Sequence, residues 1–225
     1  MSAPRPGLRQ QKKEATRARI AAAAMELFVQ RGFDDVSVAE IATAAGVTEK
    51  TVFNHFATKV DLAFPGDPAA EAALLDALES RPAGTSALDA FRDFADAVYA
   101  SYFPVDERGR RREKEIALLV DSSPTLRAWK RDMLARYAGI VRDHLATELG
   151  AADSDLRPAV VARALLAVHE GVIDGFRDAL VAGDEDAETL ARRLRASAHQ
   201  AFDLLGAGLQ DYAPGPAASP AGHAD

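Results

Sequence analysis

The chain has 225 residues, and its composition excludes several classes of protein. Hydrophobic residues make up 48%, which excludes a chain that is disordered throughout. Cysteine is absent, and this excludes disulfides, thiolate zinc sites and iron–sulfur clusters. No apolar run approaches the roughly 20 residues of a membrane-spanning helix, and the polar, basic N-terminus lacks the pattern of a secretory signal. We expect a globular cytoplasmic protein that has no membrane partner.

The net charge of −7 is unevenly distributed along the chain. Residues 1–60 carry nine Lys and Arg against six Asp and Glu, a balance of +3. Residues 61–225 carry 18 against 28, a balance of −10. A basic head on an acidic body predicts that only the head meets phosphate. The alternative is an ordinary local fluctuation of charge.

Residues 1–10 contain Pro and Gly without hydrophobic periodicity, so they are predicted to form a flexible basic arm. The first helix is predicted over 11–31, because apolar residues recur along one face and Gly32 follows as a C-cap. The residues of that face are Ile20, Ala24, Leu27 and Phe28.

Three short helices are predicted next, and the second of them covers about 49–55. Their start signals are Ser37 with Glu40 (a capping box), Thr48, and Thr58 with Asp61, and their stop signals include Gly46 and Pro65-Gly66. Together with the first helix they form a predicted domain over 11–65.

Longer helices are predicted in the rest of the chain, in a second domain over 66–209. Their ranges are 68–80, 86–103, 108–121, 124–149, 156–182 and 185–208. Alternating strand patterns and hairpin turns are scarce, so the fold class is all-α with about nine to ten helices. Residues 210–225 are rich in Pro, Ala and Gly and are predicted to be a disordered tail.

The segment from Ser37 to Phe56 has the pattern of a helix-turn-helix. Apolar residues share one face of its first helix, and Gly46 permits the positive φ of a tight turn. Val52 and Phe56, four residues apart, face inward on the second helix. The outward face carries Glu49, Lys50, Thr51, Asn54 and His55. A short polar helix held on a buried scaffold has the right size for a major groove.

A longer stretch, residues 14–64, resembles the TetR family of transcriptional regulators in register and without insertion. The matching residues are Arg19-Ile20, Ala24, Leu27-Phe28, Gly32-Phe33, Ser37-Val38, Ile41-Ala42, Ala45-Gly46-Val47, Thr51-Val52-Phe53, His55-Phe56, Lys59 and Leu62. The resemblance implies a homodimer that binds operator DNA through an N-terminal three-helix domain. It also implies a C-terminal helical body that dimerises and binds a small-molecule effector.

The resemblance also implies which residues contact DNA. Base edges are assigned to Glu49, Lys50 and Asn54, and phosphate to several polar neighbours. The full set comprises Arg17, Ser37, Thr48, Glu49, Lys50, Thr51, Phe53, Asn54, His55 and Lys59. The arm residues Arg5, Arg9, Lys12 and Lys13 either add phosphate or minor-groove contacts or only aid solubility.

Four members of this set have alternative interpretations. The family commonly has Tyr where this chain has Phe53, and Phe cannot donate the hydrogen bond to phosphate, so packing is expected for it. Glu49 either accepts from a cytosine amino group or caps its own helix, and capping is favoured. His55 is otherwise a half-buried histidine, and Lys59 a solvated helix charge.

The last two long helices carry the evidence for dimerisation. Apolar residues cover more than one face between 160 and 181, so two partners must cover them. The predicted interface comprises Leu166, Ile173, Leu194, Ala198, Ala201, Phe202 and Leu205. The alternative is that the same residues form an internal core.

An aromatic-rich set of residues is the candidate effector pocket, although such a set is more often plain core. It comprises Phe94, Tyr99, Trp129, Tyr137, His169 and Phe176. His169 is either a polar handle for the ligand or a core histidine bonded to a backbone carbonyl. The charged run 108–115 either binds an anion such as phosphate or coenzyme A, or is a solvated first turn. Among regulators with a similar body are some that sense acyl-coenzyme A-like ligands.

The predicted function is repression from a pseudo-palindromic operator that a small-molecule ligand releases. No P-loop, glycine-rich dinucleotide turn or paired-histidine zinc motif occurs, so no cofactor, metal site or catalysis is expected. The alternatives are an activator, a ligand-independent DNA-binding protein and, most remotely, an all-helical enzyme.

Overall fold

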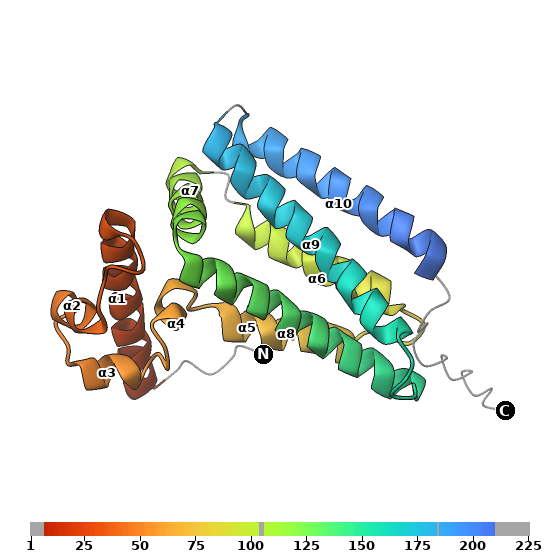
Figure 1. Ribbon diagram of the computed structural model, residues 1–225, viewed down its shortest axis with the longest axis horizontal. Coiled ribbons are helices and arrows are strands. Elements are labelled where there is room, and N and C mark those ends of the chain that lie inside the picture. Colours follow the sequence, from red (N-terminus) through yellow and green to blue (C-terminus); the bar gives the residue numbers. More distant parts are fainter. Residues whose placement is uncertain (1–6, 104–105, 184, 210–225) are drawn as a thin grey trace. The chain divides into compact units, whose positions relative to one another are not determined.

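The computed structural model describes residues 7–103, 106–183 and 185–209, and the regular structure of these residues is entirely helical (Figure 1). They form ten helices and no strand, which confirms the all-α prediction. None of these helices combines the length and the hydropathy needed to cross a membrane. The chain forms two compact units, which are described separately below.

Unit 1 comprises residues 1–68 and 118–129. Its complete helices are α1 (Leu8–Arg31), α2 (Val38–Ala44), α3 (Glu49–Phe53) and α4 (Val60–Ala63), and α1 contacts both α2 and α4. Its buried core includes Ile20, Ala24, Phe28, Phe33, Val36, Ile41, Val52, Phe56, Leu62 and Leu126.

The expected arm and tail lie largely outside the described residues. Residues 8–10 of the expected arm, however, are the first residues of α1, which begins three residues earlier than predicted. Gln10 Nε2 donates to Glu14 Oε1 at 2.7 Å, a polar contact one helical turn apart that the apolar periodicity did not reveal.

The predicted start signals of the short helices are confirmed. The Ser37 hydroxyl accepts from the Glu40 N–H, while the Glu40 carboxylate accepts from the Ser37 N–H at 2.8 Å. Thr58 and Asp61 make the same reciprocal pair of hydrogen bonds ahead of α4. These signals are local in sequence, which explains why they are predictable.

Residues 118–129 join unit 1, although the sequence alone assigned them to the second domain. The Asp34 carboxylate accepts hydrogen bonds from Ser123 Oγ at 2.8 Å and Thr125 Oγ1 at 2.7 Å. These two hydroxyl donors hold the pKa of Asp34 below its usual range. Trp129 stacks on Phe64, with ring centroids 4.1 Å apart. The partners are more than 60 residues apart along the chain, so no local pattern reveals them.

Unit 2 comprises residues 69–117 and 130–225, and its described part carries the longer helices. They are α5 (Asp67–Glu79), α6 (Ala87–Tyr102), α7 (Glu107–Ser122), α8 (Pro124–Leu149), α9 (Arg157–Ala182) and α10 (Ala187–Leu209), and the predicted ranges differ from them by at most two residues. The unit boundary falls within α7 and α8, and α5 begins in unit 1. Helices α9 and α10 lie side by side and antiparallel, and α6 contacts both (Figure 1).

Candidate nucleic-acid interface

Helix α3 has one buried face and one exposed face. Val52 is 1% exposed and Phe56 just beyond the helix is 2% exposed, so both pack into the core of unit 1. The side away from the core presents Glu49, Lys50 and Asn54 to solvent, and Lys50 and Asn54, four residues apart, share one face. Gly46, with φ of +63°, makes the turn between α2 and α3. The helix-turn-helix geometry that the pattern predicts is therefore present.

Phe53 lies on this exposed face, with 51% of its surface accessible. The expectation that Phe53 packs into the protein is therefore wrong. Phe53 follows the buried Val52 by one residue, and a step of about 100° around the helix carries its side chain away from the core. It follows Lys50 by three residues, which places these two side chains next to each other on the helix surface.

Thr48 supplies the cap of α3. Its hydroxyl accepts from the Thr51 N–H at 3.2 Å, and the two threonine hydroxyls lie 2.9 Å apart. Glu49 lies in the first turn, where the helix dipole favours a carboxylate, but the side-chain cap comes from Thr48. Ser37 is engaged in its own capping box, and its hydroxyl donates to Glu40 Oε2 at 2.7 Å.

The cations Arg17 and Lys59 pack against the core of unit 1. The Arg17 guanidinium lies 4.1 Å from the centroid of the Phe56 ring and donates to the carbonyls of His55 and Pro65. The Lys59 ammonium lies 4.4 Å from the centroid of the Phe33 ring, and burial lowers its pKa. Both side chains therefore stabilise the packing of unit 1, independently of any contribution to DNA binding.

His55 is partly buried beside these cations. Burial and then the charges of Lys13 and Arg17 lower its pKa, so its neutral form is favoured. Its Nδ1 atom is buried without a hydrogen-bond partner among the described residues. These facts agree with the half-buried histidine that the sequence left open as an alternative.

The predicted dimer-interface residues are mostly internal to unit 2. Leu166, Leu194, Ala198 and Phe202 are at most 7% exposed in a single chain. Buried side chains cannot form a surface for a second copy, so these four form protomer core, as the alternative interpretation held. Ile173, Ala201 and Leu205 are partly buried. For these four residues the side chains point into the protomer, whereas the location of the interface on the last two helices stays a prediction.

Most of the predicted pocket residues lie in one hydrophobic cluster of unit 2. His169 stacks on Tyr99 with ring centroids 5.5 Å apart, and its Nδ1 lies 3.3 Å from the Tyr99 hydroxyl. Burial lowers the pKa of His169 to about 4, so it is neutral at pH 7. Phe94, Tyr137 and Phe176 are buried in the same cluster. Trp129, whose stacking partner Phe64 belongs to unit 1, is not part of it.

Beside this cluster lies a buried polar network that the sequence did not predict. Arg177 Nε donates to the Tyr102 hydroxyl at 2.9 Å, and Tyr102 also hydrogen-bonds the Glu113 carboxyl. Burial raises the pKa of Glu113, and its Oε2 atom has no partner among the described residues. The only signal in the sequence is the occurrence of two glutamates in the cationic run 108–115, which does not reveal that the Glu113 side chain faces inward.

Comparison with known proteins gives consistent matches. Residues 20–64 match the model of bacterial regulatory proteins of the tetR family. The chain is 33% identical over 192 residues to the HTH-type transcriptional regulator TcmR of Streptomyces glaucescens, which covers 83% of this chain and 82% of TcmR. Among solved structures it is similar to NalD, the secondary repressor of the MexAB-OprM multidrug efflux pump in Pseudomonas aeruginosa. That match has 25% identity and a TM-score of 0.56, over 84% of this chain and 96% of NalD. It also shares the fold of SmeT in a complex with triclosan, at 22% identity and a TM-score of 0.57, over 94% of this chain and 100% of that one.

Proposed function

Because this chain belongs to the TetR family of bacterial regulatory proteins, it is a DNA-binding transcriptional regulator, and we propose that the exposed face of α3 reads its operator. The observation that carries the proposal is the two-sided character of α3. Val52 and Phe56 fix the helix in unit 1, while Lys50, Phe53 and Asn54 point into solvent. A chromosome-binding regulator acts in the cytoplasm of a bacterium, which is where we propose this one acts.

Side-chain chemistry divides the work on this face. Lys50 donates to guanine O6 or N7, and Asn54 pairs with adenine N6 and N7 in the major groove. Thr48 and Thr51 are engaged with each other at the helix start, where their hydroxyls and the helix dipole favour a phosphate. The orientation of α3 is maintained by the packing and capping contacts of Arg17, Ser37, His55 and Lys59. We also propose that these four residues contact phosphate groups.

The test begins with an operator selected from random duplexes. We expect Lys50→Ala to weaken operator binding by about 1–3 kcal/mol while leaving random DNA nearly unchanged. Lys12→Ala, on the exposed start of α1, is the matched control, because a phosphate contact weakens both kinds of DNA alike. Equal losses on operator and random DNA for Lys50→Ala would contradict base reading.

Dimerisation brings together the DNA-binding domains of two copies of the chain. We propose that the dimer surface lies on the exposed sides of α9 and α10. Val160 and Leu204 are 63% and 78% exposed, and a second chain packed on these helices would remove this apolar surface from water. Small exposed residues such as Ala167, Gly171 and Ala196 allow close helix approach. Two heads related by a two-fold axis require a pseudo-palindromic operator.

The surface is tested by Leu204→Glu with light scattering and operator titration. We expect a monomer with weakened operator binding, since a charge in an apolar interface is costly. Leu75→Glu, at another exposed leucine of unit 2, is the control and should stay dimeric. A monomeric wild-type chain at micromolar concentration would refute the two-fold geometry.

Repression with release by an effector is the proposed mode of regulation. NalD, a repressor, supports repression as the direction, and a transcription assay in which the chain raises promoter output would establish an activator. The aromatic cluster around His169 and Tyr99 supports an apolar effector with one polar group that replaces the bond between them. An effector must bind the released state more tightly than the operator-bound state.

An acyl-coenzyme A-like ligand is a second candidate effector. The observation in its favour is the combination of this apolar cluster with the cationic first turns of α7. Adding hexanoyl-coenzyme A to the operator complex tests it directly. Release of the operator supports it, and unchanged operator affinity at saturating ligand rejects it.

A further inference from the structure

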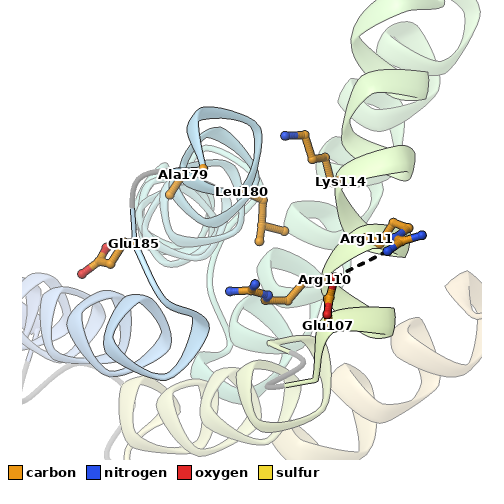
Figure 2. A pocket seen from close by; sticks show the side chains of 8 residues that line it. Glu107, Arg110, Arg111, Lys114, Ala179, Leu180 and Glu185 are labelled. Carbon is orange, nitrogen blue, oxygen red and sulfur yellow. Dashed lines mark hydrogen bonds and ion pairs between the residues drawn. The ribbon is translucent and has the colours of Figure 1, made fainter.

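A pocket of about 290 Å³ opens on the surface of unit 2, between the first turns of α7 and the end of α9 (Figure 2). It is lined by Glu107, Arg110, Arg111, Lys114, Ala179, Leu180, Gly183 and Glu185. The lining therefore combines three cations and two carboxylates with a small apolar floor, which is formed by Ala179 and Leu180. None of the lining residues is a buried member of the hydrophobic cluster around His169, although Ala179 and Leu180 pack against that cluster.

The two carboxylates of the lining already have cationic partners. Glu185 forms an ion pair at 2.9 Å with Arg193, which is not part of the pocket lining. Glu107 pairs with Arg111 at 3.5 Å, and both side chains are more than 70% exposed, so this pair is weak. The remaining charge of the lining is positive and belongs to Arg110 and Lys114.

Arg110 and Lys114 face the pocket from adjacent turns of α7. Figure 2 shows the Arg110 guanidinium directed into the pocket below Leu180, with Lys114 at its rim. Within the described residues, no carboxylate lies at ion-pair distance from Arg110. The Lys114 ammonium donates to the carbonyl of Val181 at 3.1 Å, which uses one of its three N–H bonds. The remaining N–H donors are available to an anion.

The placement of these cations is costly for the helix. Arg108 and Arg110 lie in the first turn of α7, at the positive end of the helix dipole, and the next turn carries Arg111, Arg112 and Lys114. Pairs such as Arg108 with Arg111, and Arg110 with Lys114, also repel each other at helical spacing. An anion bound between Arg110 and Lys114 would relieve the repulsion within that pair and the unfavourable interaction of Arg110 with the helix dipole.

We propose that this pocket binds the phosphate group of a small phosphomonoester with a short apolar substituent. A phosphomonoester carries a charge of about −1.5 to −2 at pH 7, which matches the two unneutralised cations. The planar fork of Arg110 fits two phosphate oxygens, and Lys114 adds a point charge. Leu180 and Ala179 contact the apolar substituent. The proposal does not rest on operator binding, because no lining residue belongs to the helix-turn-helix.

The binding test uses the full-length chain without DNA. Isothermal titration calorimetry compares inorganic phosphate, methyl phosphate, butyl phosphate and butyrate. We expect saturable binding of one phosphate ligand per chain, with butyl phosphate about tenfold tighter than methyl phosphate, because three more carbons are partly buried on the apolar floor. Butyrate should bind at least tenfold more weakly than butyl phosphate. Equal affinities for butyrate and butyl phosphate, or no saturable phosphate binding at millimolar concentrations, would overturn the proposal.

Two variants of the same helix separate the site from a diffuse cationic surface. Arg110→Gln should weaken butyl phosphate at least tenfold, whereas Arg112→Gln, which removes the same charge outside the lining, should change it less than twofold. Lys114→Gln replaces Arg110→Gln if the latter unfolds. Equal losses at positions 110 and 112 would reject a defined site. A chain that binds butyl phosphate but no operator would retain this site and refute the proposed function instead.

Discussion

Phe53 provides the sharpest test of how α3 meets DNA. Its side chain is 51% exposed on the face that carries Lys50 and Asn54. A Phe side chain has an accessible area of about 200 Å², so about 100 Å² is open to solvent. Complete burial of that area would stabilise a complex by up to about 2.5 kcal/mol. An aromatic side chain in the major groove finds its apolar partner in the 5-methyl group of thymine.

The perturbation is therefore made on both molecules. Each thymine of one half-site is replaced in turn by deoxyuridine, which removes only the methyl group. At one thymine of the half-site we expect a loss of about 0.8 kcal/mol for the wild-type chain, or about fourfold in Kd. Phe53→Ala should bind the unmodified operator about tenfold or more weakly and should no longer respond to that replacement.

The assay is fluorescence anisotropy at fixed salt, because phosphate contacts make all affinities salt-dependent. Val29→Ala, which shortens another exposed apolar side chain on α1, is the matched control and should respond to deoxyuridine as the wild type does. If Phe53→Ala and the wild type respond equally to every replacement, the two changes are uncoupled and Phe53 does not read thymine.

Two further predictions concern stability. Because burial holds the pKa of His169 near 4 against an ordinary 6.5, the unfolded chain takes up a proton that the folded chain refuses between these values, so stability is lost as pH falls through this window. Urea unfolding should show about 2 kcal/mol of this loss between pH 7 and pH 5 in the wild type but not in His169→Gln, and equal pH dependence in both would refute the assignment. Gly46→Ala should destabilise the helix-turn-helix by about 1 kcal/mol, because φ of +63° strains an L residue although no atom lies within 4 Å of the added Cβ. Gly139→Ala, within α8, is its control and should be neutral or stabilising in thermal unfolding.

The features that the sequence predicted well are those whose partners lie within one helical turn. The capping box of Ser37 and Glu40 is one example, and the positive φ at Gly46 is another. Each depends on two or three neighbouring residues and on backbone rules that hold in any fold. Helix bounds follow from the same local chemistry, which is why the predicted ranges of the long helices are nearly correct.

Phe53 shows why a resemblance can mislead about a single side chain. The loss of a hydroxyl relative to the usual Tyr removes one hydrogen bond, but it does not turn the residue toward the core. The orientation follows from the position of Phe53 one residue after the buried Val52. The helical phase was therefore the better guide than the identity of the side chain.

The assignment of Leu118–Trp129 to unit 1 depends on contacts that no local pattern contains. Asp34 meets Ser123 and Thr125 across some 90 residues of chain, and Leu126 is fully buried in the same unit. Hydroxyl and carboxylate residues are common on surfaces, so their pairing is visible only in three dimensions. The domain boundary predicted from the Pro65-Gly66 turn signal therefore lies at residue 65 and leaves out Leu118–Trp129.

Helix α9 shows the same limit for dimerisation. Its apolar residues cover most of its girth, which predicted a cover from a second subunit. In the structure, α6 and α10 of the same chain contact α9, and Leu166 and Phe176 are buried there. An apolar girth thus indicates that a helix is enclosed, but not by which chain. Apolar side chains that stay exposed in a single protomer are the ones that a second chain can cover. By this criterion the better candidate surface is the one around Val160 and Leu204, whose small neighbours permit close approach.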